Sequence, residues 1–205
     1  MKKIILFSLV LAMSLATISC KKEAKEAKKS DSAQFSIEPK TVVINWIGYK
    51  TTSKIPVKGE FKEVTISNIK EAPTAVEAMN GSQFSIPVSS LFSDLEDRDT
   101  KLKELFFGVM DATINLTGTV NLNDDGTGNV NLKMNGVSKE IPVTYTVSDQ
   151  IVQFEGTLDI VDDFNAQSAL ESLSKACFDL HKGPDLVSKT WSEVTISARA
   201  HLKKK

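Results

Sequence analysis

Two side chains that can bind a metal ion, Cys177 and His181, stand four residues apart near the end of a predicted helix. This spacing puts both on one helix face, as zinc sites often require. A zinc site needs further ligands, however, and the whole chain contains only two His and two Cys. Cys177 also continues an apolar stripe with Leu170 and Leu173. The sequence therefore favours a core thiol at Cys177 and predicts neither a metal site nor a cofactor.

A second group of residues imitates a calcium-binding loop. Asn121, Asn123, Asp125 and Gly126 match its first, third, fifth and sixth positions. The last position of such a loop is an acidic bidentate ligand, but Leu132 stands there, and strands rather than helices flank the segment. The sequence predicts a hairpin turn here.

Catalytic motifs are absent from the sequence. It contains no nucleophile elbow, no phosphate-cradling glycine loop and no paired-His zinc motif. His181 and His201 are the only imidazoles, and neither stands in a recognisable catalytic arrangement with Ser or Cys. An esterase or isomerase acting on lipids would need a cluster of perturbed titratable groups in the interior. We predict that the protein is not an enzyme and has no catalytic residues.

The elements around these residues are mostly strands, because apolar and polar residues alternate along much of the chain. Between Asp111 and Ile160 four such stretches follow one another. Asn135-Gly136, between two of them, tolerates the positive φ values of a type I′ hairpin turn. The phase of the alternation slips between Phe61 and Val64, which predicts a bulge or bend there. The predicted strands are 41–50, 55–69, 84–88, 114–122, 130–134, 137–147, 152–160 and 194–202.

Helical spacing of apolar residues predicts helices over 93–110 and 165–181, with a short helix or turn at 71–80. Eight strands are the number at which an antiparallel sheet closes with room for side chains or one small ligand. Closure also removes the unpaired edges that aggregate. The predicted fold class is all-β, an eight-stranded antiparallel up-and-down barrel with two short helices.

The first 33 residues are predicted to lie outside this fold. Lys2-Lys3 followed by an apolar run indicates a signal peptide over residues 1–19. The segment 15–20 (LATISC) resembles a bacterial lipobox, which implies a lipidated Cys20; a plain secretory signal is the alternative. Residues 21–33 contain no apolar residue larger than Ala, so 20–33 is predicted to be a disordered tether. We expect a folded domain at 34–205, anchored in the bacterial cell envelope, on the periplasmic side or the outer-membrane surface.

The charge of the folded part argues against nucleic acid as a partner. The chain carries a net charge of −1. The first 33 residues contain seven Lys and three acidic residues, so the remaining residues carry −5. Proteins that bind nucleic acid present a basic face instead. If Cys20 is lipidated, Cys177 has no disulfide partner, and burial protects such a thiol outside the cytoplasm. The sequence does not predict an oligomeric state.

Three parts of the chain resemble the YceI-like family in the family's own order. They are NWIGYK (45–50) with VKGEF (57–61), RDTKL (98–102) with Phe106-Phe107, and MNGVSK (134–139). The resemblance covers most of residues 40–160. Lys101 stands where the family usually has His, so any role of that imidazole is absent. The helix at 165–181 and the segment 188–191 look like features of a lipoprotein subgroup.

The resemblance implies a lipocalin-like barrel that, in some members, holds a polyisoprenoid chain. Strand phase places ten residues on the inner face as candidate ligand contacts: Trp46, Phe84, Ile114, Leu116, Leu132, Met134, Val143, Tyr145, Phe154 and Leu158.

The helix at 93–110 supplies three further candidate contacts, Arg98, Leu102 and Phe106. Arg98 and Asp99 could hold a phosphate or polar headgroup at the mouth of the barrel. Alternatively, Asp99 belongs to the helix start and Arg98 is solvated or bridged. Phe106 and Phe107 are interpreted as a lid or plug, and one of them should point outward because helix neighbours lie about 100° apart.

These observations predict an envelope lipoprotein that binds a polyisoprenoid or similar long apolar lipid inside a β-barrel and sequesters or carries it. Its partners would be that lipid and the membrane, reached through the lipid anchor. The alternative is a ligand-free structural or interaction barrel of the cell envelope, with a role in the stress response as one option.

Overall fold

The computed structural model of the protein describes residues 34–205. The predicted signal peptide, the lipidated Cys20 and the tether lie outside these residues. The strands are β1 (Phe35–Ile37), β2 (Val43–Lys50), β3 (Ile55–Phe61), β4 (Thr65–Ser67), β5 (Gln83–Pro87), β6 (Leu91–Phe92), β7 (Asn115–Leu122), β8 (Thr127–Met134), β9 (Val137–Ser148), β10 (Ile151–Asp159) and β11 (Thr190–Lys204). The helical segments are η1 (Pro39–Thr41), α1 (Ala75–Met79), η2 (Val88–Ser90), α2 (Glu96–Lys101), η3 (Leu102–Phe106), η4 (Phe107–Val109), α3 (Gln167–Ala176) and η5 (Asp179–His181).

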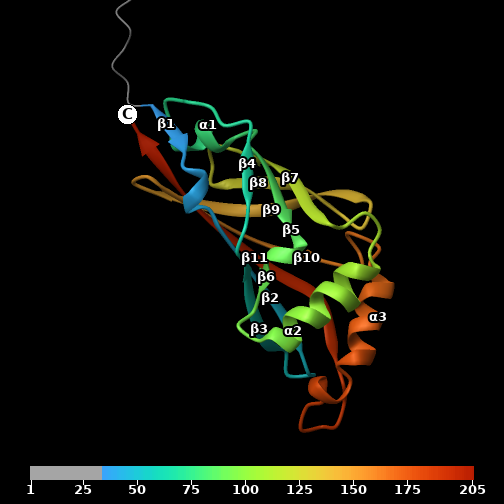
Figure 1. The fold of residues 1–205 in the computed structure, drawn as a ribbon. Coiled ribbons are helices and arrows are strands. Elements are labelled where there is room, and N and C mark those ends of the chain that lie inside the picture. The colour runs from blue at the N-terminus through green and yellow to red at the C-terminus, as the bar shows by residue number, and fades with distance from the viewer. Residues whose placement is uncertain (1–33) are drawn as a thin grey trace, which may run out of the picture. The chain divides into compact units, whose positions relative to one another are not determined.

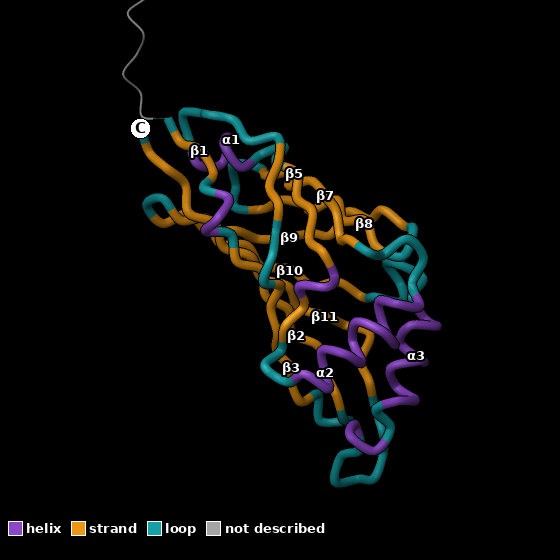
Figure 2. The backbone as a smooth tube through the Cα atoms, in the orientation of Figure 1, coloured by secondary structure: helices purple, strands orange, loops and turns teal. Residues whose placement is uncertain are grey.

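One antiparallel sheet forms the body of residues 34–205 (Figure 1). Its strands follow the order β4-β5-β7-β8-β9-β10-β11-β2-β3-β6, and β1 pairs with the far end of β11. The sheet is strongly curled (Figure 2). The all-β antiparallel class is therefore confirmed. The prediction of a closed eight-stranded barrel is wrong, because this sheet has eleven strands and its path ends at β4 and β6.

The difference in strand number comes from two bent segments. Residues 55–69 were predicted as one strand, but the chain turns a corner after β3 and continues as β4, where the phase slips. The chain bends in the same way at η2, between β5 and β6. Across the corner the two segments stay together, since the Lys62 amide donates to the Ser90 carbonyl over 2.9 Å. Each bent segment thus counts as two strands, and β1 is a strand that the sequence analysis did not predict.

The hairpin predictions are confirmed by the backbone. Asn135 and Gly136 have φ values of 51° and 71°, and they join β8 to β9 with Met134 opposite Val137. The turn from β7 to β8 contains Gly126 with a φ of 86°. There the Asp125 side chain accepts a 2.9 Å hydrogen bond from the Thr127 amide, as in an Asx turn. The pseudo-calcium loop is therefore a hairpin turn.

The helices gather mainly at one end of the sheet, where η3, the continuation of α2, lies beside α3 (Figures 1 and 2). The predicted helix at 93–110 is divided: α2 gives way to a π-helical turn, η3, and then to a 3-10 turn, η4. The predicted helix at 165–181 ends at Ala176 and is followed by η5. None of the helices in 34–205 is long and apolar enough to cross a membrane.

The apolar residues form two core clusters. The larger lies between the sheet and the segments α2–η4 and α3 and includes Phe164, which is fully buried. The smaller lies near β1 and α1 and includes Val152 and Leu202. α1 is held in place by a capping box, in which Thr74 and Glu77 satisfy each other's backbone amides. Residues of both clusters line the cavity that forms the candidate site on the concave face of the sheet.

Candidate functional site

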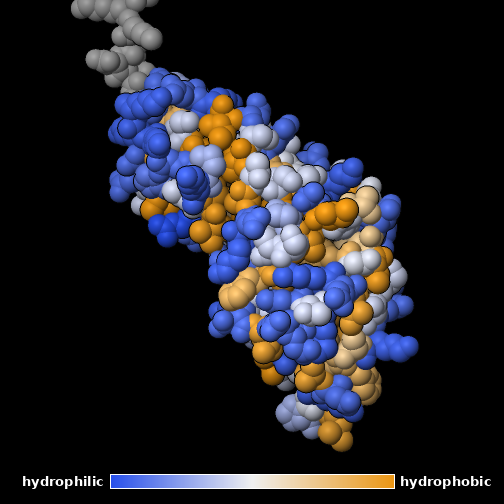
Figure 3. Space-filling view, in the orientation of Figure 1, coloured by the Kyte–Doolittle hydropathy of each residue, from blue (hydrophilic) through white to orange (hydrophobic). Residues whose placement is uncertain are grey.

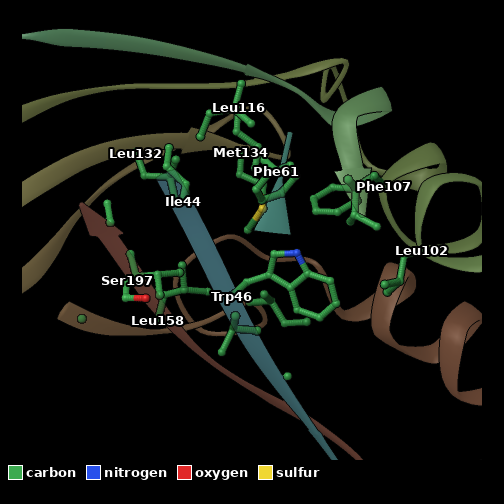
Figure 4. Close-up of a pocket in the computed structure, with 18 of the residues that line it drawn as sticks. Ile44, Trp46, Phe61, Leu102, Phe107, Leu116, Leu132, Met134, Leu158 and Ser197 are labelled. Atoms are coloured by element: carbon green, nitrogen blue, oxygen red, sulfur yellow. The ribbon is translucent and has the colours of Figure 1, made fainter. Parts of the chain in front are cut away.

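A cavity of about 380 Å³ lies on the concave side of the sheet. Its wall consists almost entirely of apolar side chains from the strands (Figure 4). Along most of the strands alternate residues reach it, because the side chains between them point to the outer face, whereas consecutive residues of β10 and β11 line it. The strand residues that form the wall include Ile44 and Trp46 from β2, Phe61 from β3, Leu116 from β7, Leu132 and Met134 from β8, Phe154 and Leu158 from β10, and Val194 and Ile196 from β11.

The helical segments close one side of the cavity with Leu102, Phe106 and Phe107. The rings of Phe106 and Phe107 meet edge to face, with centroids 4.9 Å apart and planes at 76°. Both rings line the cavity, so the prediction that one of them points outward is wrong. The prediction assumed α-helical spacing, whereas the boundary between the π-helical turn η3 and the 3-10 turn η4 falls between these two residues.

The cavity reaches solvent between α2 and η5. Leu95 and Leu180 line it and yet are 50% and 59% exposed, which marks an opening at this place. The charged side chains that line the cavity near this opening are Lys50, Asp97, Arg98 and Lys101, together with His181, and Glu155 on β10 and Arg199 on β11 line it elsewhere. We call the residues Lys50, Leu95, Arg98, Lys101, Leu180 and His181 the mouth.

The mouth is held together by polar contacts between distant parts of the chain. Lys50 Nζ donates to the Leu180 carbonyl over 3.2 Å, which ties β2 to η5. His181 Nδ1 lies 2.7 Å from Thr190 Oγ1 on β11. Burial, with a smaller effect of the nearby Lys50, lowers the pKa of the His181 imidazole, so this side chain is neutral at pH 7. The mouth is therefore moderately basic through its Lys and Arg side chains.

Arg98 and Asp99, predicted together as a headgroup site, have different surroundings. Asp99 is buried and accepts a 2.5 Å hydrogen bond from Ser93 Oγ, so it belongs to the start of the helix, as the alternative interpretation stated. Arg98 lines the cavity, and its guanidinium donates to the Ser93 carbonyl over 3.4 Å. Lys101, which replaces the family's His, also lines the cavity and forms an ion pair with Asp97. The cationic side chains at the mouth are therefore Arg98, Lys50 and Lys101, and Asp97 offsets the charge of Lys101.

Eleven of the thirteen predicted contact residues line the cavity: Trp46, Phe84, Arg98, Leu102, Phe106, Leu116, Leu132, Met134, Val143, Phe154 and Leu158. Their contact with a ligand stays a prediction. Ile114 was wrongly placed on the inner face. It is 82% exposed, because β7 begins only at Asn115 and Ile114 belongs to the preceding loop. Tyr145 does not line the cavity either. It packs beside Phe154 in the smaller cluster, and its hydroxyl donates to the Asn123 carbonyl.

Sequence reasoning missed several residues of the wall and the mouth. Val194 and Ile196 on β11 had the required alternation but were not included among the contacts. Leu170 and Leu173 of α3 line the cavity through the apolar stripe that was recognised in the sequence. Lys50 carried no local signal, because its place at the mouth depends on contacts with residues 130 positions away along the chain.

Cys177 is buried and belongs to the larger core cluster, as the core-thiol interpretation predicts. It also lines the cavity. Burial raises the pKa of its thiol, and this effect outweighs the opposing effect of Lys101. His181 lies beyond the end of α3 and contacts Thr190.

The Cys177 thiol is expected to react slowly with a disulfide reagent in the native protein at pH 7.5. The raised pKa leaves little thiolate, and burial limits access of the reagent. Absorbance after addition of Ellman's reagent measures the rate, and the same protein in guanidinium chloride should react many times faster. Equal rates in both states would show that Cys177 is accessible in the native protein.

Comparison with known proteins comes from a family model and from solved structures. The model described as "YceI-like domain" matches residues 18–202. A polyisoprenoid binding domain from Saccharophagus degradans, implicated in plant cell wall breakdown, has 12% sequence identity and a TM-score of 0.57 over 83% of this chain and 98% of that chain. BcnA of Burkholderia cenocepacia has 16% identity and a TM-score of 0.50 over 82% and 99%. These likenesses show a shared fold. None of the curated proteins compared with the chain matches it.

Proposed function

This chain belongs to the YceI-like domain family, and from that premise we propose that it binds one long apolar lipid, such as a polyisoprenoid, along the concave face of its sheet. The observation that carries this proposal is the apolar cavity of about 380 Å³. Its size lies within the range of roughly 300–1,000 Å³ typical of ligand sites. The polyisoprenoid binding domain from Saccharophagus degradans shares the fold of this chain, and this likeness supports the same ligand class.

Burial of hydrocarbon provides the affinity in this proposal. Moving an alkyl chain from water into such a wall gains about 0.8 kcal/mol for each CH₂ that is buried. Few polar groups line the cavity away from the mouth, so the wall offers few directional hydrogen bonds to the alkyl chain of the lipid. A charged or polar headgroup would remain at the mouth, where Arg98 and the lysines attract anionic oxygens without leaving water. The role that follows is sequestration or carriage of the lipid rather than catalysis.

Loading of the stripped protein with a defined polyisoprenoid tests this proposal. Protein extracted with organic solvent and refolded is incubated with solanesol, a nine-unit prenyl alcohol, and separated from free lipid by gel filtration. We expect lipid to elute with the protein in a one-to-one complex. A protein peak without lipid would instead favour the ligand-free structural or interaction module.

We also propose that the protein is an envelope lipoprotein anchored through Cys20. The support is the segment LATISC at residues 15–20 and the apolar run before it. Replacement of Cys20 with Ser is expected to abolish palmitate labelling in cells and to move the protein from the membrane fraction to the soluble fraction. The wild-type protein, fractionated in parallel, is the control. Membrane association that is unchanged in Cys20→Ser would contradict the anchor.

A further inference from the structure

The segment that leads from α3 to β11 exposes a group of apolar side chains beside the mouth. Phe178, Leu180, Leu186 and Val187 are 54%, 59%, 78% and 50% exposed, and we call these four residues the tip. Neither core cluster of residues 34–205 includes any of them. Figure 3 shows hydrophobic residues at the end of the molecule where this segment lies. Single exposed apolar side chains are common on protein surfaces, but a group of them marks a surface that contacts a partner.

The loop that carries half of the tip has a fixed shape. The Asp185 carboxylate accepts hydrogen bonds from Thr52 Oγ1 over 2.6 Å and from the Val187 amide over 3.1 Å. Leu186, between these two residues, has a φ of 62°, a value that bulky side chains rarely adopt. Such a backbone persists only where its surroundings hold it. The exposure of Leu186 is therefore a consequence of the loop structure and not of a free chain end.

The tip stands where a ligand must enter or leave the cavity. Leu180 belongs both to the tip and to the mouth, since it lines the cavity and is exposed to solvent. The next residue, His181, also lines the cavity. A long apolar molecule that crossed water between a membrane and the mouth would expose its whole hydrocarbon surface. Contact of the tip with the membrane would allow the molecule to pass without this exposure.

The tip and the point where the chain enters the domain lie at opposite ends of β11. Phe35 pairs with Lys204 near the end of β11, whereas His181 contacts Thr190 at its start. The 15 residues of β11 span about 50 Å, and Figure 1 shows the C-terminus and the loop before β11 far apart. Residues 20–33 reach about 50 Å when fully extended. An anchor at the start of this tether therefore leaves the tip free to meet a membrane.

We propose that the tip inserts into the surface of a lipid bilayer and holds the mouth against it, so that the ligand passes directly between bilayer and cavity. Residues 178–189 contain two Asp and two Lys, so apolar contact rather than charge holds this surface to its partner. A second copy of the chain fits less well, because four side chains fall short of the about 800 Å² per partner that a stable interface buries. This inference rests on the proposed lipid-binding function and adds the partner that delivers the lipid.

Fluorescence quenching by nitroxide-labelled lipids tests this inference directly. The full chain with Leu186→Cys is labelled at the new thiol with the dye NBD and added to vesicles of phosphatidylethanolamine and phosphatidylglycerol, with and without nitroxide-labelled lipid. Cys177 is buried, and the wild-type protein, treated in the same way, measures any dye at other sites. We expect the nitroxide lipid to lower the emission at residue 186 by about twofold or more, because inserted side chains lie at the boundary of headgroups and acyl chains.

Ile114→Cys, labelled with the same dye, is the matched control. Ile114 is 82% exposed, close to the value for Leu186, but it precedes β7 and does not line the cavity. Its emission should be the same with and without nitroxide lipid. If the dye at residue 186 is quenched no more than the dye at residue 114, the tip does not insert and the inference is overturned.

Uptake of solanesol from vesicles gives a second measurement. The stripped full chain is incubated with vesicles that contain solanesol, and the solanesol that elutes with the protein in gel filtration is quantified at successive times. Leu186→Asp is expected to slow this uptake by about tenfold or more, because a carboxylate resists entry into the apolar part of the bilayer. Ile114→Asp should load at the wild-type rate. Circular dichroism confirms that both variants are folded.

Solanesol supplied in solution separates this inference from the proposed function. Leu186 and Ile114 do not line the cavity, so both variants should reach the wild-type amount of bound solanesol from solution. Equal rates of uptake from vesicles for all three proteins would contradict the docking of the tip. A wild-type protein that retains no solanesol from either source would instead contradict the proposed function, and quenching at residue 186 would still decide whether the tip docks.

Discussion

Replacement of Leu132 with Trp is expected to reduce the lipid that co-purifies with the protein by about tenfold or more and to leave the fold intact. The Leu132 side chain points from β8 into the cavity, and an indole there would occupy much of the space of about 380 Å³. A lipid chain that entered the remaining space would overpack the wall. Overpacking typically costs about 1–3 kcal/mol, which corresponds to a loss of up to about a hundredfold in affinity. Phe154→Trp, at a lining residue of β10, should act in the same way.

The matched control is Lys133→Trp. Lys133 is the next residue on β8, and its exposed side chain points to the outer face of the sheet. The same large side chain is therefore added on the other side of the same strand. Lipid extracted from each purified variant is quantified by mass spectrometry, and circular dichroism reports the fold. If Leu132→Trp and Phe154→Trp carry as much lipid as Lys133→Trp, the assignment of the inner face as the ligand site is wrong.

The largest expected effect on stability is that of Phe164→Ala. Phe164 is fully buried in the larger core cluster, between the end of β10 and the start of α3. Removal of a buried phenylalanine ring lowers the free energy of unfolding by about 3–5 kcal/mol, from lost burial and from the cavity that remains. Urea denaturation followed by circular dichroism measures this difference.

Phe178→Ala is the control for the same chemical change at an exposed site. The Phe178 side chain is 54% exposed, and its ring contacts Lys182 Nζ at 4.6 Å from the centroid. Its removal should lower the free energy of unfolding by no more than about 1 kcal/mol. Similar losses for the two variants would mean that the α3 end of the core is not packed as described.

Much of the sheet could be predicted because period-two alternation is a local signal. Along β8 the inward Leu132 and Met134 alternate with exposed neighbours, and the same pattern identified the inner faces of β7 and β10. Alternation predicts the direction of a side chain only for residues within the strand. Ile114 has the right phase but stands one residue before β7, so its side chain is in solvent.

The architecture was harder to predict because it depends on long-range pairing. The phase slip after Phe61 indicated a bend. It did not indicate that β3, before the bend, pairs with β6, whereas β4, after the bend, pairs with β5. The change from α2 to a π-helical turn, which brings Phe107 to the cavity beside Phe106, has no clear sequence signal. The mouth combines Lys50 with Leu180, and only the fold brings these residues together.

Mass spectrometry of the lipid carried by the natural protein tests the central claim most directly. The protein is purified from its own cells without added lipid, and the molecules that it holds without a covalent bond are extracted into organic solvent and quantified against the protein. We expect one long apolar molecule, with prenyl or alkyl mass spacing, in a near one-to-one ratio to the protein. An extract that contains no such molecule above the background of an unrelated lipoprotein purified in parallel would contradict the claim that the curled sheet encloses a lipid.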